Sequence, residues 1–207
     1  MGRRSNHTPE QLRQLILDAA YGIIETDGLA GLSAREIARR IKYSPGTIYN
    51  MYQNLDDVVL HVEARVLDAL DQCLEAAIGG AHADASARIR GLARAYLAFT
   101  HEKPKLWNLL FEHYLPAGSD TPAWYQRKLE CLMGRVEEAM APLFPADAGV
   151  ERMRAARVLW ASVHGITSLS TANKLVSVTT DTAASLVDDL IDNYLRGLRA
   201  GRDPQAT

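Results

Sequence analysis

The stretch whose residue types are best suited to chemistry runs from residue 33 to 52, SAREIARRIKYSPGTIYNMY. Between residues 35 and 52 it holds four basic residues and one acidic residue. Hydroxyl, amide and phenol side chains follow, and these neutral donors can contact phosphates and base edges without repelling the nucleic-acid backbone. The candidate nucleic-acid contacts are Ser33, Arg35, Arg39, Lys42, Ser44, Pro45, Gly46, Thr47, Tyr49, Asn50 and Tyr52.

Two short helices must position these residues. Ser33 and Glu36 have the spacing of a capping box, which predicts the start of the first helix, and Ser44-Pro45 predicts the start of the second. Two short helices joined by about three residues form a helix-turn-helix, whose second helix fits the major groove of DNA. The small Pro45-Gly46 pair permits a close approach, and free backbone N–H groups there can hold a phosphate. The alternative is a solvated helix pair with ordinary surface arginines.

The composition describes a globular protein with a local nucleic-acid surface. Of 207 residues, 47% are hydrophobic and 23% are charged, and the net charge is -2, so no global basic field is present. The two cysteines lack metal-ligand spacing and predict a reducing compartment, which we expect to be the cytoplasm. No apolar run approaches the ~20 residues of a membrane span. The N-terminal segment MGRRSNHT is interpreted as an arm, with Arg3-Arg4, and not as an export signal.

Helical periodicity extends over nearly the whole chain and predicts an all-α fold of about nine helices. The helix that begins at Asn54 reaches about residue 78, where Gly79-Gly80 ends it, and is on the order of 35 Å long. Residues 175–180, LVSVTT, are interpreted as a connection and not a strand. A helix-turn-helix domain over 1–53 and a C-terminal domain over 54–207 are expected. The predicted helices cover 9–27, 33–41, 44–52, 54–78, 84–102, 104–114, 122–141, 149–174 and 181–199.

The order of residues in this region resembles the signature of the TetR family of bacterial transcriptional repressors. The matching positions are Arg35-Glu36-Ile37-Ala38, Arg40, Ser44, Gly46-Thr47, Tyr49, Tyr52 and Asp56-Asp57. The resemblance implies DNA contacts for Thr47 and Tyr49 and phosphate contacts for Tyr52, Ser33 and Ser44. Two positions depart from the family pattern. Lys42-Tyr43 occupy a turn that usually holds glycine, and Leu55 stands where a phosphate-binding lysine is usual, so Arg39, Lys42 or the Arg3-Arg4 arm is expected to replace that contact.

The C-terminal region is expected to form a dimer and to bind a small molecule. The predicted helices 149–174 and 181–199 each carry an apolar stripe, which serves either the monomer core or the homodimer interface that the family forms with these two helices. Trp160…His164-Gly165 resembles the WHG-type C-terminal branch of the family, although His164 also suits a structural role. Aromatic residues gather in the same region and either fill the core or line an apolar effector pocket. The candidate ligand-binding residues are Tyr96, Phe99, Trp107, Phe111, Trp124, Tyr125, Trp160 and His164.

Other classes of function fit the sequence less well. His101-Glu102 and Glu112-His113 lack the spacing that places two metal ligands on one helical face, and no nucleophile elbow or phosphate-binding loop is present, so neither an enzyme nor a cofactor is expected. A helical adaptor with a degenerate helix-turn-helix remains the alternative. The expected function is a ligand-responsive repressor, a homodimer that binds a palindromic double-stranded DNA operator and is released by a small, mostly apolar effector.

Overall fold

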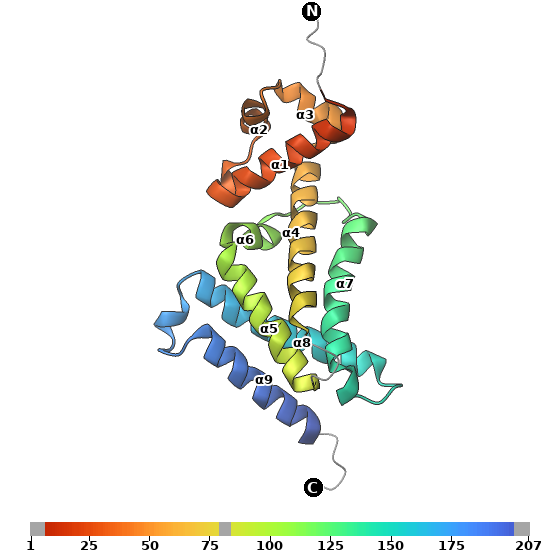
Figure 1. Ribbon diagram of the computed structural model, residues 1–207, viewed down its shortest axis with the longest axis vertical. Coiled ribbons are helices and arrows are strands. Elements are labelled where there is room, and N and C mark those ends of the chain that lie inside the picture. The colour runs from red at the N-terminus through yellow and green to blue at the C-terminus, as the bar shows by residue number, and fades with distance from the viewer. Residues whose placement is uncertain (1–6, 79–83, 201–207) are drawn as a thin grey trace, which may run out of the picture. The chain divides into compact units, whose positions relative to one another are not determined.

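The computed structural model describes residues 7–78 and 84–200, and within these ranges the chain forms nine α-helices and no strand (Figure 1). The all-α prediction is therefore confirmed. Residues 175–180 are a connection, with one short 3-10 turn at Leu175–Ser177. The predicted helix end at Gly79-Gly80 and the Arg3-Arg4 arm lie outside the described residues. The helices are α1 (Pro9–Asp27), α2 (Ala34–Ile41), α3 (Pro45–Met51), α4 (Leu55–Ala77), α5 (Ala85–Glu102), α6 (Pro104–Glu112), α7 (Ala123–Met140), α8 (Gly149–Thr171) and α9 (Ala183–Ala200).

Local capping interactions explain where the first helices begin and end. Thr8 and Gln11 form a complete capping box at the start of α1, and Gly28 ends that helix with a φ of 75°, a conformation that glycine adopts without a steric penalty. The side chain of Asn54 accepts a hydrogen bond from the backbone N–H of Asp57 at 2.8 Å, which caps α4. These starts agree with the sequence-based prediction.

Backbone contacts divide the chain into two compact units. The N-terminal unit consists of residues 7–68 and 103–126, and the C-terminal unit consists of 69–102 and 127–200. Both α4 and α7 run from one unit into the other. This division by contacts differs from the predicted functional division at residues 53 and 54, because the start of α4 and the whole of α6 pack with the N-terminal helices. The functional division into 1–53 and 54–207 stays a prediction.

In the N-terminal unit, α1 is the central helix and contacts α2, α3 and α6. Its apolar face buries Ile16, Ile23 and Ile24 completely, and Ile37 of α2 and Ile48 of α3 are buried equally deeply. Burial of such side chains contributes about 1.5–3 kcal/mol each. Because α2 and α3 each bury only a narrow apolar face, their polar residues remain at the surface.

In the C-terminal unit, α5, α8 and α9 pack against one another (Figure 1). Ile89 of α5 and Val187 and Ile191 of α9 are buried in this unit. Ion pairs join α5 to α9 at the surface, with Arg90 bonded to Asp192 at 2.6 Å and Arg94 bonded to Asp188 at 2.6 Å. None of the helices in the described part of the chain is long and apolar enough to cross a membrane.

Candidate nucleic-acid interface and effector cavity

The candidate nucleic-acid surface is the polar face of α3 and the turn before it. Ile48 is fully buried and anchors the helix, whereas Tyr49 is 53% exposed and Asn50 is also exposed. Ser44, Pro45 and Gly46 are exposed at the helix start, and Thr47 is half-buried. The structure therefore brings the α3 candidates together on one accessible face, with an uncrowded helix N-terminus.

The sequence predicts that the hydroxyl of Ser44 caps α3, but in the structure it does not. Ser44 has the extended conformation of an N-cap, but its side chain makes no capping hydrogen bond. Instead, its hydroxyl lies 3.1 Å from the hydroxyl of Thr47. No side chain caps the first N–H groups of α3, although the backbone N–H of Thr47 bonds to the carbonyl of Ser44 at 3.0 Å.

The predicted capping box at α2 is only half formed. Ser33 accepts from the backbone N–H of Glu36 at 3.1 Å, but the Glu36 carboxylate turns to the arginines one turn further along. Arg39 binds it with two hydrogen bonds of 2.7 Å, and Arg40 adds one of 3.1 Å. These bonds, chiefly that from Arg39, lower the pKa of Glu36 to about 2. Arg39 remains 72% exposed, so a phosphate would compete with Glu36 for its guanidinium, while Arg35 is exposed as well.

Lys42 occupies the position between α2 and α3 where the chain reverses. Its φ is 61° and its ψ is 39°, which is the left-handed region. An L-residue with a Cβ pays roughly 1–2 kcal/mol there, whereas glycine does not. The departure from glycine at this turn thus carries a conformational cost, and it places an exposed lysine shortly before α3.

Tyr52 is the one predicted DNA contact that the structure contradicts. Its side chain is 5% exposed, and its hydroxyl donates to the backbone carbonyl of Arg13 at 3.1 Å. Burial raises the pKa of the phenol, as expected for an apolar surrounding. Tyr52 therefore fixes the end of α3 against α1 and does not present its hydroxyl to a phosphate.

Four of the eight candidate ligand-binding residues belong to the N-terminal unit. Trp107 and Phe111 of α6 contact each other with ring centroids 5.1 Å apart. Trp124 packs against His61 of α4 at 5.0 Å, and Trp124 and Tyr125 meet edge to face at 5.8 Å. Trp107 and Tyr125 are buried in the core of that unit, whereas Trp124 is half-buried and Phe111 is 38% exposed.

A buried polar network also lies within the N-terminal unit. The imidazole Nδ1 of His113 lies 3.0 Å from the carboxylate of Glu63, and its Nε2 lies 3.3 Å from Asp56. Only 7% of the His113 side chain and 4% of the Glu63 side chain are exposed. The hydrogen bond with Glu63 raises the pKa of His113. Burial raises the pKa of Tyr125, whose hydroxyl also bonds to Glu63.

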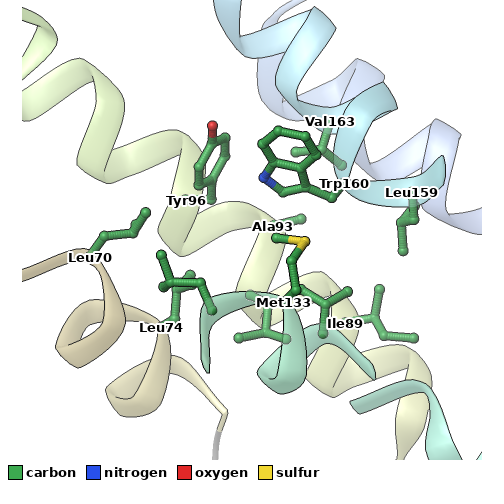
Figure 2. A pocket seen from close by; sticks show the side chains of 12 residues that line it. Leu70, Leu74, Ile89, Ala93, Tyr96, Met133, Leu159, Trp160 and Val163 are labelled. Atoms are coloured by element: carbon green, nitrogen blue, oxygen red, sulfur yellow. The ribbon is translucent and has the colours of Figure 1, made fainter. Parts of the chain in front are cut away.

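The C-terminal unit contains an apolar cavity between four helices (Figure 2). Of the candidate ligand-binding residues, Tyr96 and Trp160 line it. Phe99 is buried in the same unit but is not among the lining residues. The cavity volume open to water-sized molecules is about 70 Å³. The lining residues are Leu70 and Leu74 of α4, Ile89, Leu92, Ala93 and Tyr96 of α5, Leu132, Met133 and Val136 of α7, and Leu159, Trp160 and Val163 of α8.

His164 lies behind two of the residues that line the cavity, Trp160 and Tyr96. It stacks on Trp160 with ring centroids 5.3 Å apart, and its Nδ1 is 3.0 Å from the Tyr96 hydroxyl. Burial lowers the pKa of His164, so the imidazole is neutral near pH 7. His164 thus contacts two lining aromatics and is not itself among the lining residues.

The aliphatic lining residues were not predicted, because their spacing is that of any core-facing helical stripe. Glu63 of the buried polar network was also not predicted. The sequence does contain a signal for it, since Glu63 is an acid within the otherwise apolar series Val59, Val62 and Val66. Within the described residues, no group of three His, Cys, Asp or Glu side chains could hold a metal ion.

Comparisons with known proteins agree with this architecture. Residues 16–62 match the family model described as bacterial regulatory proteins, tetR family. Residues 89–194 match the model described as Tetracyclin repressor-like, C-terminal domain. An uncharacterised HTH-type transcriptional regulator of Mycobacterium tuberculosis is 23% identical over 171 residues, which cover 82% of this chain and 74% of the relative.

Solved structures share the fold over nearly the full length. A Rhodococcus sp. RHA1 protein of unknown function has a TM-score of 0.73 and 25% identity, with 96% of this chain and 100% of the other covered. A TetR-like transcriptional regulator from the same organism has a TM-score of 0.62 and 19% identity, with 95% and 99% covered. The second likeness shows the fold alone.

Proposed function

Since the chain belongs to the TetR family of bacterial regulatory proteins, we propose that it is a homodimeric repressor that binds a palindromic operator and is released by a small, mostly apolar effector. The observation that carries this proposal is the surface of α3. Its buried side is anchored by Ile48, and its exposed side presents Tyr49 and Asn50 beside a helix N-terminus that lacks a side-chain cap. A short helix held in this way is suited to the major groove.

The dimer is proposed to form through α8 and α9. One face of α8 is apolar and open to solvent in the single chain, with Val158 47% exposed, Leu169 42% exposed, and Ala161 and Gly165 exposed between them. These four positions recur at helical spacing. A Cβ added at Gly165 would meet no atom within 4 Å, so packing inside the chain does not require glycine there. A second copy of the chain can approach closely at such a position.

The stripes predicted on these two helices divide between core and surface. Leu159 and Val163 of α8 and Ile191 and Leu195 of α9 are buried in the chain itself. The half-buried apolar residues of α9 recur every four positions and extend the proposed interface, namely Leu186, Leu190, Tyr194 and Leu198. Two-fold dimers of this kind place their recognition helices about one DNA turn apart, ~34–36 Å.

The cavity in the C-terminal unit is the proposed effector site, because it is concave and apolar and two of its lining residues, Tyr96 and Trp160, are aromatic. Leu70 and Leu74 line it from α4, the helix that begins at Leu55 directly after the recognition helix. We propose that α4 couples the effector to DNA binding. By linkage, the effector weakens operator binding by the same factor by which the operator weakens effector binding. The first four residues of α7 also belong to the N-terminal unit, and the rest of α7 belongs to the C-terminal unit. Helix α4 is therefore not the sole helix that runs from one unit into the other.

The test is binding to a duplex that covers the promoter of the protein's own gene, measured as a function of salt. Affinity should fall steeply with rising salt, because Lys and Arg displace counterions from phosphates. Tyr49→Ala and Thr47→Ala should each weaken binding by about 1–3 kcal/mol, the usual value of a base contact. Size-exclusion chromatography should show the same oligomer as for the wild type.

The matched control is Tyr114→Ala, which removes an 81% exposed tyrosine outside the helix-turn-helix. It should bind the duplex like the wild type. If the α3 variants also bind like the wild type, α3 is not the reading element. If the wild type shows no binding at low salt, the adaptor alternative is favoured. The weak DNA binding would then be explained by the pairing of Arg39 with Glu36 and by the apolar Leu55.

A further inference from the structure

The chemistry of the cavity wall identifies the class of effector, and this inference rests on the cavity's proposed function. Ten of the twelve lining residues are aliphatic, alanine or methionine, and the other two are Tyr96 and Trp160. The lining therefore holds two polar groups, the phenol hydroxyl and the indole N–H. The Tyr96 hydroxyl is already hydrogen-bonded to His164 at 3.0 Å.

The indole N–H of Trp160 is the donor that lacks a partner. Figure 2 shows the indole nitrogen turned toward Tyr96 and Ala93, among the side chains that enclose the cavity. The described part of the chain makes no hydrogen bond to this group, and the one recorded ring contact of Trp160 is its stacking on His164. Indole nitrogen donates only, and Trp160 is half-buried, so its N–H can meet an acceptor that enters the cavity. A ligand in the cavity can supply it.

A charged ligand has no counter-ion in this wall. No lysine or arginine is among the lining residues, and His164 behind them is neutral near pH 7 because burial lowers its pKa. Arg135, which follows the lining residues Leu132 and Met133 on α7, is bound by Asp71 at 2.7 Å and by Glu75 at 3.3 Å. Moving a carboxylate into an apolar site without a paired cation is strongly unfavourable.

We propose that the effector is an uncharged, largely hydrocarbon molecule with one hydrogen-bond acceptor, and that the indole N–H of Trp160 binds this acceptor. A ketone, ester or ether oxygen fits this description. A cavity of about 70 Å³ corresponds to roughly five to seven water molecules, and hence to a compound slightly larger than benzene.

The experiment compares three probes that share one skeleton. They are isopropylbenzene, acetophenone and benzoate, which differ by carrying no acceptor, a neutral acceptor or a carboxylate. Dissociation constants are measured by calorimetry for the wild type, for Trp160→Phe, and for the control Trp124→Phe, whose tryptophan lies in the N-terminal unit. The readout is the ketone's affinity relative to that of the hydrocarbon. We expect this ratio to fall about fivefold in Trp160→Phe and to be unchanged in Trp124→Phe. The carboxylate should bind the wild type at least about 100-fold more weakly than the ketone.

A second measurement uses the wild-type protein and does not depend on the folding of a variant. In ¹⁵N-labelled protein, the ketone should shift the Trp160 indole proton resonance downfield, and the hydrocarbon should not. Carboxylate binding as tight as that of the ketone, or equal indole shifts with ketone and hydrocarbon, would overturn the inference and leave the cavity as a ligand site. If none of the three probes binds saturably, the cavity's proposed role is overturned together with the inference.

Discussion

Replacing Glu63 with alanine is expected to lower the free energy of unfolding by about 3–5 kcal/mol, the range for removing one partner of a buried ion pair. The side chains of Glu63 and His113 are 4% and 7% exposed, and the Tyr125 hydroxyl bonds to the same carboxylate. Alanine leaves both partners buried without their acceptor. Urea unfolding followed by circular dichroism measures the loss.

The matched control for this change is Glu25→Ala in the same unit. Glu25 pairs with Lys103 at 3.4 Å, but its side chain is 47% exposed, and exposed ion pairs contribute about 0–1 kcal/mol. A loss for Glu63→Ala no greater than that for Glu25→Ala would show that the buried network does not stabilise the fold.

The same ion pair makes stability depend on pH. Its hydrogen bond raises the pKa of His113 above the unfolded value of about 6.5, and Asp56 acts in the same direction. Below pH ~6.5 the imidazole is protonated in both states and the stabilisation is fully present. As pH rises through the folded-state pKa, the imidazolium loses its proton and the stabilisation is lost. The thermal midpoint should therefore fall above neutral pH, and Glu63→Gln should abolish most of this fall. An unchanged slope in Glu63→Gln would assign the pH dependence to another group.

Replacing Gly165 with leucine should disrupt the dimer and leave the fold of the chain intact. A side chain at this position meets no atom of its own chain within 4 Å, and leucine is a better helix former than glycine by about 1 kcal/mol. In a close-packed helix interface, the same side chain costs about 1–3 kcal/mol per overpacked site. Because a symmetric dimer contains the site twice, dimer dissociation should increase on the order of 100-fold or more.

Analytical ultracentrifugation measures this dissociation, and circular dichroism checks the fold. Gly134→Leu on α7 is the matched control, since a Cβ there also meets no atom within 4 Å and α7 lies outside the proposed interface. Operator affinity should fall with the loss of the dimer in Gly165→Leu alone. Identical dimers in both variants would contradict the assignment of the interface to α8.

The helices were predictable because their signals are local. Thr8, Ser33 and Asn54 accept backbone N–H groups from residues three positions on, and Gly28 ends α1, so the chain near each end is sufficient to define it. The exposed face of α3 was also predictable, since periodicity alone separates buried Ile48 from exposed Tyr49 and Asn50. The lining of the cavity was not predictable, because periodicity shows that a residue faces inward but not which inward-facing neighbours it meets.

By itself, the sequence determined the helices, their order and the residues available on α3, because caps, turns and helical spacing act within a few residues. Where a side chain has several possible partners, the packing of the helices selects the one that it contacts. Helix packing buried Tyr52 against the carbonyl of Arg13, and it placed Trp107 and Trp124 in a different unit from Trp160. These outcomes depend on residues far apart in the chain, which come into contact only when the helices pack.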